Sequence, residues 1–142
     1  MGLEFATVCA IRGAFLKAHL TLNLRHLVGT PELARDALFS DVTEADLRRY
    51  FPQLQSESFR MELETMVLSL PNPKKVLAND TPILVLAGEK DRVFSVKEQQ
   101  RTARTYGTEA EIFPGMAHDM MLEPNWKLVA NRILDWLDTS GL

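Results

Sequence analysis

PILVLAGEKDRVF at residues 82–94 and PGMAHDMMLE at residues 114–123 are the two stretches that decide the fold of this chain. The unbroken apolar run Pro82–Gly88 is typical of a parallel strand that is covered on both faces. An acidic residue, Asp91, follows this strand, and a histidine, His118, lies in the loop after a second short strand. Sites in open parallel sheets lie beyond the carboxyl ends of the strands, so we expect these two side chains to meet at one edge of the sheet.

The C-terminal part of the chain, residues 76–142, alternates between strand and helix patterns. Ser95–Glu98 forms a capping box, which predicts a helix that runs to Tyr106. Residues 110–114 follow as a short strand, and a helix is expected over 126–138, where apolar residues recur at helical spacing. This βαβα order favours a right-handed crossover and a parallel sheet.

Upstream of this unit the sequence predicts one strand and then a run of short helices. Residues 1–12 contain the apolar, partly β-branched stretch 3–11, which favours a strand. Residues 13–75 are expected to be helical, and the apolar content near Leu20–Leu24 also permits a strand there. The expected helices cover 14–28, 31–39, 43–52 and 54–70. We therefore predict a single α/β domain with a short parallel sheet of about three strands, flanked by helices.

Composition and charge exclude several classes of function. The 142 residues carry a net charge of −3 and no basic stripe, which argues against a nucleic-acid partner. No apolar run reaches the roughly 20 residues that a membrane span requires, and the N-terminus lacks the layout of a secretory signal. The single cysteine, Cys9, rules out an intrachain disulfide and favours a cytoplasmic protein. His19 and His26 have no carboxylate partner in their pattern, so we expect no metal.

A carboxylate bonded to one imidazole nitrogen fixes the tautomer of the ring, and the other nitrogen can then accept a proton from a nucleophile. The order Asp91 then His118, late in the chain, is that of the acid and base in an α/β-hydrolase triad. Residues 82–138 resemble the C-terminal end of an α/β-hydrolase of the esterase and lysophospholipase-like type. The resemblance lies in the strand with Asp91, the loop with His118 and the closing helix WKLVANRILDWL.

The resemblance implies a partial α/β-hydrolase fold in which residues 13–75 form the helical cap. It also implies that Asp91 and His118 are the catalytic acid and base of a serine-hydrolase triad, with no cofactor. Met116 and Met120 are candidates for lining the site of a small apolar, ester-like ligand, although packing within the loop explains them equally well. Asp91 could instead cap a turn or pair with Lys90 or Arg92, and Asp119 is expected to stabilise the loop.

The nucleophile of such a triad lies in a G-x-S-x-G elbow, and this sequence contains none. No glycine lies two positions before or two positions after any of the six serines, Ser40, Ser56, Ser58, Ser69, Ser95 and Ser140. Loss of the nucleophile lowers the rate on the order of 10⁶-fold, so we expect the chain alone to be catalytically silent.

Three hypotheses follow for the function of the chain. The first is a non-catalytic binding or oligomerisation module derived from a hydrolase. The second is half of a split hydrolase that needs an N-terminal partner. The third is an enzyme with an unrecognised nucleophile. An exposed edge on the strand at residues 3–11 would recruit a partner, which favours a homodimer.

Overall fold

The computed structural model describes residues 28–55, 61, 64 and 70–141. The strand expected over 3–11 and nearly all of the helix expected over 14–28 lie outside these residues, as does most of the helix expected over 54–70. The chain forms two compact units. The first contains Met1–Arg35 and Thr43–Leu70, and the second contains Asp36–Val42 and Pro71–Leu142.

Helix α2 (Pro31–Leu38) begins in the first unit, and its last three residues belong to the second. The hydroxyl of Thr30 accepts a hydrogen bond from the Leu33 N–H at 3.3 Å, and proline occupies the first helical position, where a missing N–H costs nothing. The structure confirms a helix at the place expected over residues 31–39.

Helix α3 (Glu44–Tyr50) belongs wholly to the first unit. The Thr43 hydroxyl accepts from the Asp46 N–H at 3.1 Å and caps the helix, which was expected to begin at residue 43. The chain then passes into the short 3₁₀ helix η2 (Phe51–Gln53), because the proline in it cannot continue an α-helix. Leu54 is extended, so the prediction of a helix that begins at this residue is wrong.

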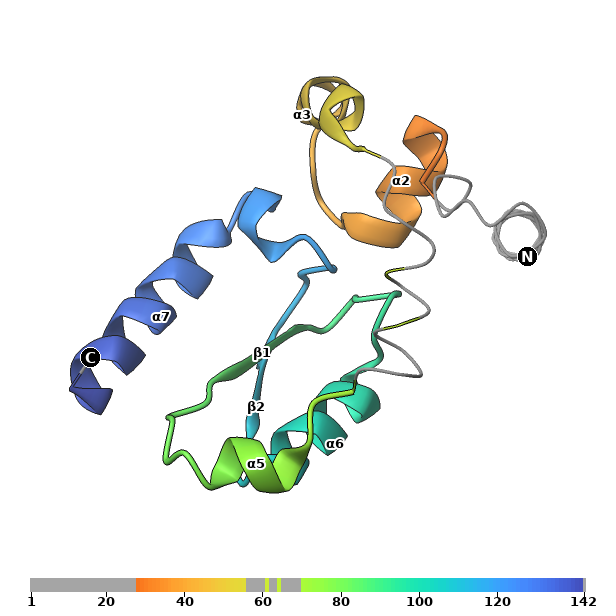
Figure 1. The fold of residues 1–142 in the computed structure, drawn as a ribbon. Helices are drawn as coiled ribbons and strands as arrows, with labels where there is room; N and C mark the ends of the chain where they lie inside the picture. The colour runs from red at the N-terminus through yellow and green to blue at the C-terminus, as the bar shows by residue number, and fades with distance from the viewer. Residues whose placement is uncertain (1–27, 56–60, 62–63, 65–69, 142) are drawn as a thin grey trace. The chain divides into compact units, whose positions relative to one another are not determined.

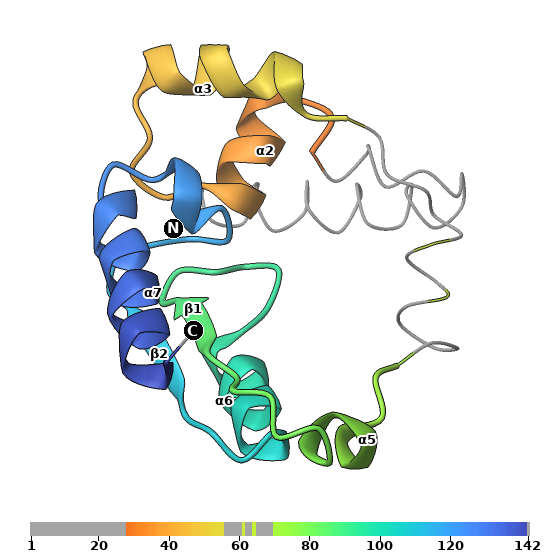
Figure 2. The same cartoon turned by 60° about the vertical axis from the view of Figure 1, so that its left-hand side comes forward.

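The second unit is built on two parallel strands, β1 (Val85–Gly88) and β2 (Ala110–Phe113), which pair residue for residue. Helix α6 (Val96–Thr105) connects them, and helix α7 (Trp126–Ser140) closes the unit. Helices α6 and α7 lie on opposite sides of the strand pair (Figures 1 and 2). The structure thus confirms the parallel pairing, and the third expected strand lies outside the described residues.

Local sequence chemistry explains the ends of these elements. The Ser95 hydroxyl accepts from the Glu98 N–H at 3.4 Å while the Glu98 carboxylate accepts from the Ser95 N–H at 2.8 Å, so the capping box is complete. Strand β1 is shorter than the apolar run that predicted it, since β2 supplies only four pairing partners. The Arg132 guanidinium on α7 bonds both carboxylate oxygens of Glu111 on β2 through Nε at 2.7 Å, which joins this helix to the sheet.

Two elements of the second unit were not expected. Helix α5 (Pro73–Leu77) begins at Asn72, whose side chain accepts from the N–H groups of Lys74 at 3.0 Å and Lys75 at 3.4 Å. Lys74 and Lys75 are exposed but lie in this helix, because an asparagine cap followed by proline starts a helix. The second element is a 3₁₀ turn, η4 (Met120–Leu122), which follows the loop that carries His118.

Candidate active site

Asp91 is held by its own turn at the end of β1. Its N–H donates to the Gly88 carbonyl at 3.2 Å. Its Oδ1 accepts from the N–H groups of Val93 at 2.7 Å and Phe94 at 2.9 Å. The side chain is only 4% exposed. An aspartate that accepts from residues two and three positions ahead is a common turn former, so the sequence folds locally in a way that fixes this carboxylate.

The loop after β2 lies against this turn because main-chain groups connect the two. The Lys90 N–H donates to the Met116 carbonyl at 2.8 Å, and the Gly115 N–H donates to the Glu89 carboxylate at 2.9 Å. A Cβ on Gly88 would stand 2.5 Å from the Met116 carbonyl oxygen and 2.9 Å from its carbon. Glycine is required at this position because the neighbouring backbone fills the space of a side chain.

This arrangement brings His118 to Asp91. The imidazole Nδ1 lies 3.0 Å from Oδ2 of Asp91, and the histidine side chain is 31% exposed. A carboxylate can only accept, so Nδ1 donates and Nε2 is left as the proton acceptor. The ring of Phe94 packs against the imidazole with its centroid 5.7 Å away and a tilt of 53°. The pair therefore has the geometry of a general base with an orienting acid.

The competing partners of Asp91 bind elsewhere. Arg92 forms an ion pair with Asp36, and the Lys90 ammonium lies 3.8 Å from Asp41. The turn-capping interpretation of Asp91 is also correct, because one carboxylate oxygen caps the turn while the other bonds the histidine.

Asp119, directly after the histidine, is a second acid beside the pair. Burial raises the pKa of Asp119 above its usual value of 3.8, the charge of His118 opposes this rise, and the carboxylates of Asp91 and Glu123 add to it. The carboxylate that bonds His118 is nevertheless that of Asp91, 27 residues away in sequence.

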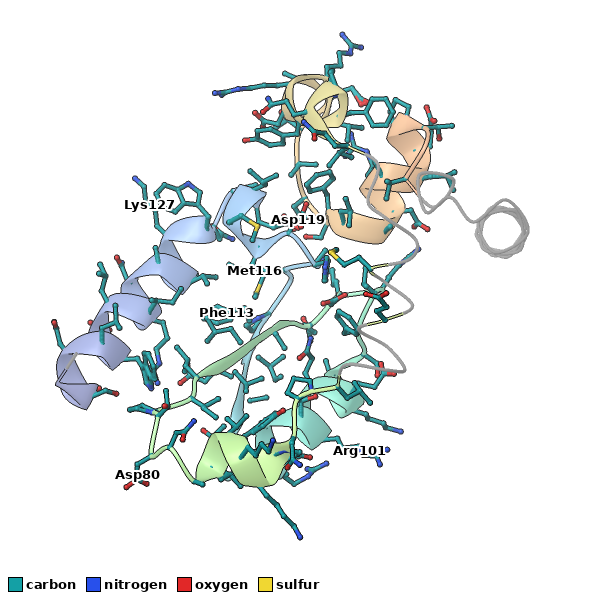
Figure 3. All side chains as sticks on the ribbon, in the orientation of Figure 1. Asp80, Arg101, Phe113, Met116, Asp119 and Lys127 are labelled. Carbon is teal, nitrogen blue, oxygen red and sulfur yellow. The ribbon has the colours of Figure 1, made fainter. Side chains whose placement is uncertain are left out.

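The two methionines named as candidate substrate residues have different surroundings. Met116 is 2% exposed and packs inside the second unit, and Met120 is half-buried on η4. Met116 and Asp119 lie in the segment that follows β2, with Phe113 at the end of that strand (Figure 3). A role for these methionines in substrate binding stays a prediction.

Sequence reasoning missed two residues that contact the histidine or its loop. Phe94 is 45% exposed next to the imidazole, and only its position in the turn after Asp91 could have indicated this. Glu123 is 2% exposed and accepts from backbone N–H groups of Ser40 and Asp41, 83 and 82 residues away. No local spacing could have revealed that contact.

The chain is similar to the monoacylglycerol lipase of Mycolicibacterium smegmatis, with 29% identity over 68 residues, which is 46% of this chain and 24% of the lipase. The chain thus spans about a quarter of the length of the curated relative that it matches. No protein-family model matches the chain, and no solved structure matches it. The likeness supports a relationship to hydrolases.

Two further observations concern the part of the chain that the structure describes. No helix in it has both the length and the apolar character to cross a bilayer. Within the same residues, no three histidine, cysteine or acidic side chains gather as metal ligands would.

Proposed function

We propose that this chain supplies the acid and the base of a serine-type ester hydrolase. The observation that carries the proposal is the 3.0 Å contact between Asp91 and His118 beyond the ends of two paired parallel strands. The likeness to a lipase over 68 residues and the resemblance of residues 82–138 to α/β-hydrolases support it.

In this proposal His118 acts as the general base. Its Nε2 takes the proton of a serine hydroxyl as the oxygen attacks the ester carbonyl, and it later returns that proton to the leaving alcohol. Asp91 holds the ring in the tautomer that leaves Nε2 unprotonated, and it stabilises the imidazolium that forms. The exposure of the histidine side chain allows a reacting group to approach.

The proposal places the nucleophile outside these 142 residues, because none of the serines lies in a G-x-S-x-G elbow. We propose that a separate segment or chain carries it, with the oxyanion donors that normally accompany it. The absent elbow also favours a second candidate, a non-catalytic binding or oligomerisation module that keeps the inherited pair.

The proposed substrate is a small apolar ester. Val93 and Phe94, each 45% exposed, lie in the turn beside the histidine, and Met121 is 67% exposed on η4. Apolar side chains next to a general base suit an acyl chain or a hydrophobic alcohol better than a charged group. The similar protein is by its name a lipase for monoacylglycerol.

Fragment complementation tests the proposal. The purified chain is mixed with an N-terminal fragment of a monoacylglycerol lipase that retains its nucleophile but ends before its own acid and histidine. We expect neither piece alone to hydrolyse a p-nitrophenyl ester or react with a fluorophosphonate, and the mixture to do both.

Activity of the mixture should fall by at least 10³-fold with His118→Asn, in line with the loss of a triad member. Labelling of the chain alone would contradict the external nucleophile. Ester binding with no turnover in any mixture would favour the binding module instead.

The expected homodimer stays a proposal as well. Sedimentation of the chain over a hundredfold range of concentration tests it, and a single monomeric species throughout would count against it.

A further inference from the structure

Glu123 is a charged residue in the interior of the second unit. Only 2% of it is exposed. Its Oε1 accepts from the N–H groups of Ser40 at 2.6 Å and Ala117 at 3.3 Å, and its Oε2 accepts from Asp41 at 3.3 Å. A buried carboxylate is costly unless it is hydrogen-bonded, and here backbone N–H groups provide those bonds.

These bonds connect two segments that are far apart in sequence. The first is Leu38–Asp41, and the second is the histidine loop, Gly115–Asp119. Besides the bonds to Glu123, the Ser40 hydroxyl donates to the Gly115 carbonyl at 2.5 Å, and the Asp119 N–H donates to the Leu38 carbonyl at 2.9 Å. Hydrogen bonds therefore hold the loop at residues 115, 117 and 119, on both sides of His118. All of these residues belong to the second unit.

We propose that Glu123 and Ser40 are positioning residues that hold His118 in bonding reach of Asp91. The carboxylate of Asp91 is already fixed by two N–H groups of its own turn. The remaining freedom of the pair lies in the histidine loop, whose main chain these two residues restrain. The functional meaning of this role depends on the proposed function, but the orientation of the imidazole does not.

Burial alone would not predict this role. Other buried residues of the unit, such as Val129 on α7, contribute apolar contact without a bond to the histidine loop. Glu123 instead uses both carboxylate oxygens on main-chain donors, one of them directly before His118. A carboxylate is needed because it presents only acceptors, whereas an amide of the same size presents a donor to at least one of these N–H groups.

The test measures how fast the Nδ1–H proton of His118 exchanges with water, by NMR of the ¹⁵N-labelled full chain. Variants Glu123→Gln and Ser40→Ala remove part of the restraint, and the second changes no charge. We expect exchange to accelerate about tenfold with Glu123→Gln, and by a smaller factor of about threefold with Ser40→Ala, because each loses one part-buried hydrogen bond and opens the loop locally.

Two further variants make the result decisive. Val129→Ala lowers stability through lost core contacts, and it should leave the exchange rate unchanged at the same temperature. His118→Asn identifies the resonance by its disappearance, and Asp91→Asn should abolish the protected signal.

The outcomes separate the two proposals. If Asp91→Asn leaves the protected signal intact, the Asp91–His118 pair fails and with it the proposed function. If the signal depends on Asp91 but the Nδ1–H proton of His118 exchanges at the wild-type rate in Glu123→Gln and in Ser40→Ala, the positioning role is overturned. If Glu123→Gln does not fold, Ser40→Ala decides the question, because it keeps the bond from the Ser40 N–H to Glu123.

Discussion

Replacing Asp91 with asparagine should reverse the tautomer of His118. In the wild type, Oδ2 can only accept, so the imidazole Nδ1 carries the hydrogen across the 3.0 Å contact. The variant keeps Oδ1 for the N–H groups of Val93 and Phe94 and presents an amide N–H₂ to the ring. Two donors cannot face each other, so the neutral imidazole moves its hydrogen to Nε2 and accepts at Nδ1. On the proposed function, His118 would then have no free acceptor for the proton of a nucleophile.

The cost in stability follows from the same contact. A hydrogen bond to a charged group contributes about 1.5–3 kcal/mol and a neutral one about 0.5–1.5 kcal/mol. Because the Asp91 side chain is 4% exposed, water screens little of this difference. Asp91→Asn should therefore lower the free energy of unfolding by about 1 kcal/mol. Urea unfolding measures this, followed by fluorescence of Trp126 and Trp136, which both lie on α7 in the same unit.

Long-range ¹H–¹⁵N correlation of the ring nitrogens measures the tautomer at a pH near 8.5, well above the usual histidine pKa of about 6.5. The matched control is Asp119→Asn, which removes the same charge from the neighbouring position and should leave the tautomer as in the wild type. A hydrogen that remains on Nδ1 in Asp91→Asn would refute the reasoning, as would a tautomer that also reverses in the control.

Three more changes have expected results. Asp119→Asn should raise the free energy of unfolding at pH 7, because burial raises the pKa of Asp119 and so disfavours its charged carboxylate in the folded protein. This advantage should shrink as the pH falls through the raised pKa toward the usual value of 3.8, and it should be absent below that value; thermal unfolding from pH 3 to 8 measures it. Ser95→Ala removes the cap of α6 and should lower the free energy of unfolding in urea by about 1 kcal/mol. The pKa of Glu98 should rise toward its usual value, because the side-chain hydrogen bond from Ser95 that lowers it is lost. Gly88→Ala places a methyl group against the main chain of Met116 and should cost about 1–3 kcal/mol and weaken the protected Nδ1–H signal of the histidine.

Controls for these changes use exposed positions. Glu109→Gln alters charge as Asp119→Asn does, and its effect should stay within about 0.5 kcal/mol at every pH. Lys97→Ala is the control for Ser95→Ala, because it changes the first turn of α6 without touching the cap. A cost for Lys97→Ala equal to that of Ser95→Ala would contradict the capping explanation.

The features predicted well from the sequence depend on near neighbours along the chain. The capping box at Ser95, the threonine cap of α3 and the period of α7 all arise within four residues or one helical face. The parallel pairing of β1 and β2 follows from the single helix between them. The meeting of Asp91 and His118 follows in turn, because parallel strands end at the same edge.

The features that were missed depend on contacts that are distant in sequence or on weak local signals. Helix α5 has an asparagine cap and a proline start, but its five residues are too short to show an apolar period. Glu123 reads as an ordinary charged loop residue, and only folding brings it to the N–H groups of Ser40 and Asp41. The exposed ring of Phe94 beside the histidine depends on the tertiary placement of two loops.

The loop around His118 is anchored almost entirely through its own main chain: the N–H and carbonyl of Gly115, the Met116 carbonyl, and the N–H groups of Ala117 and Asp119. Side chains on the adjoining turn can therefore be exchanged without disturbing the imidazole. On the proposed function, libraries randomised at Met120 and Met121 should change which esters are accepted, while His118 and its contact with Asp91 stay the same in every member. Because the side chains of this turn are separate from the main-chain bonds that hold the histidine loop, the turn is a suitable place to alter the substrate selectivity that the proposed function implies.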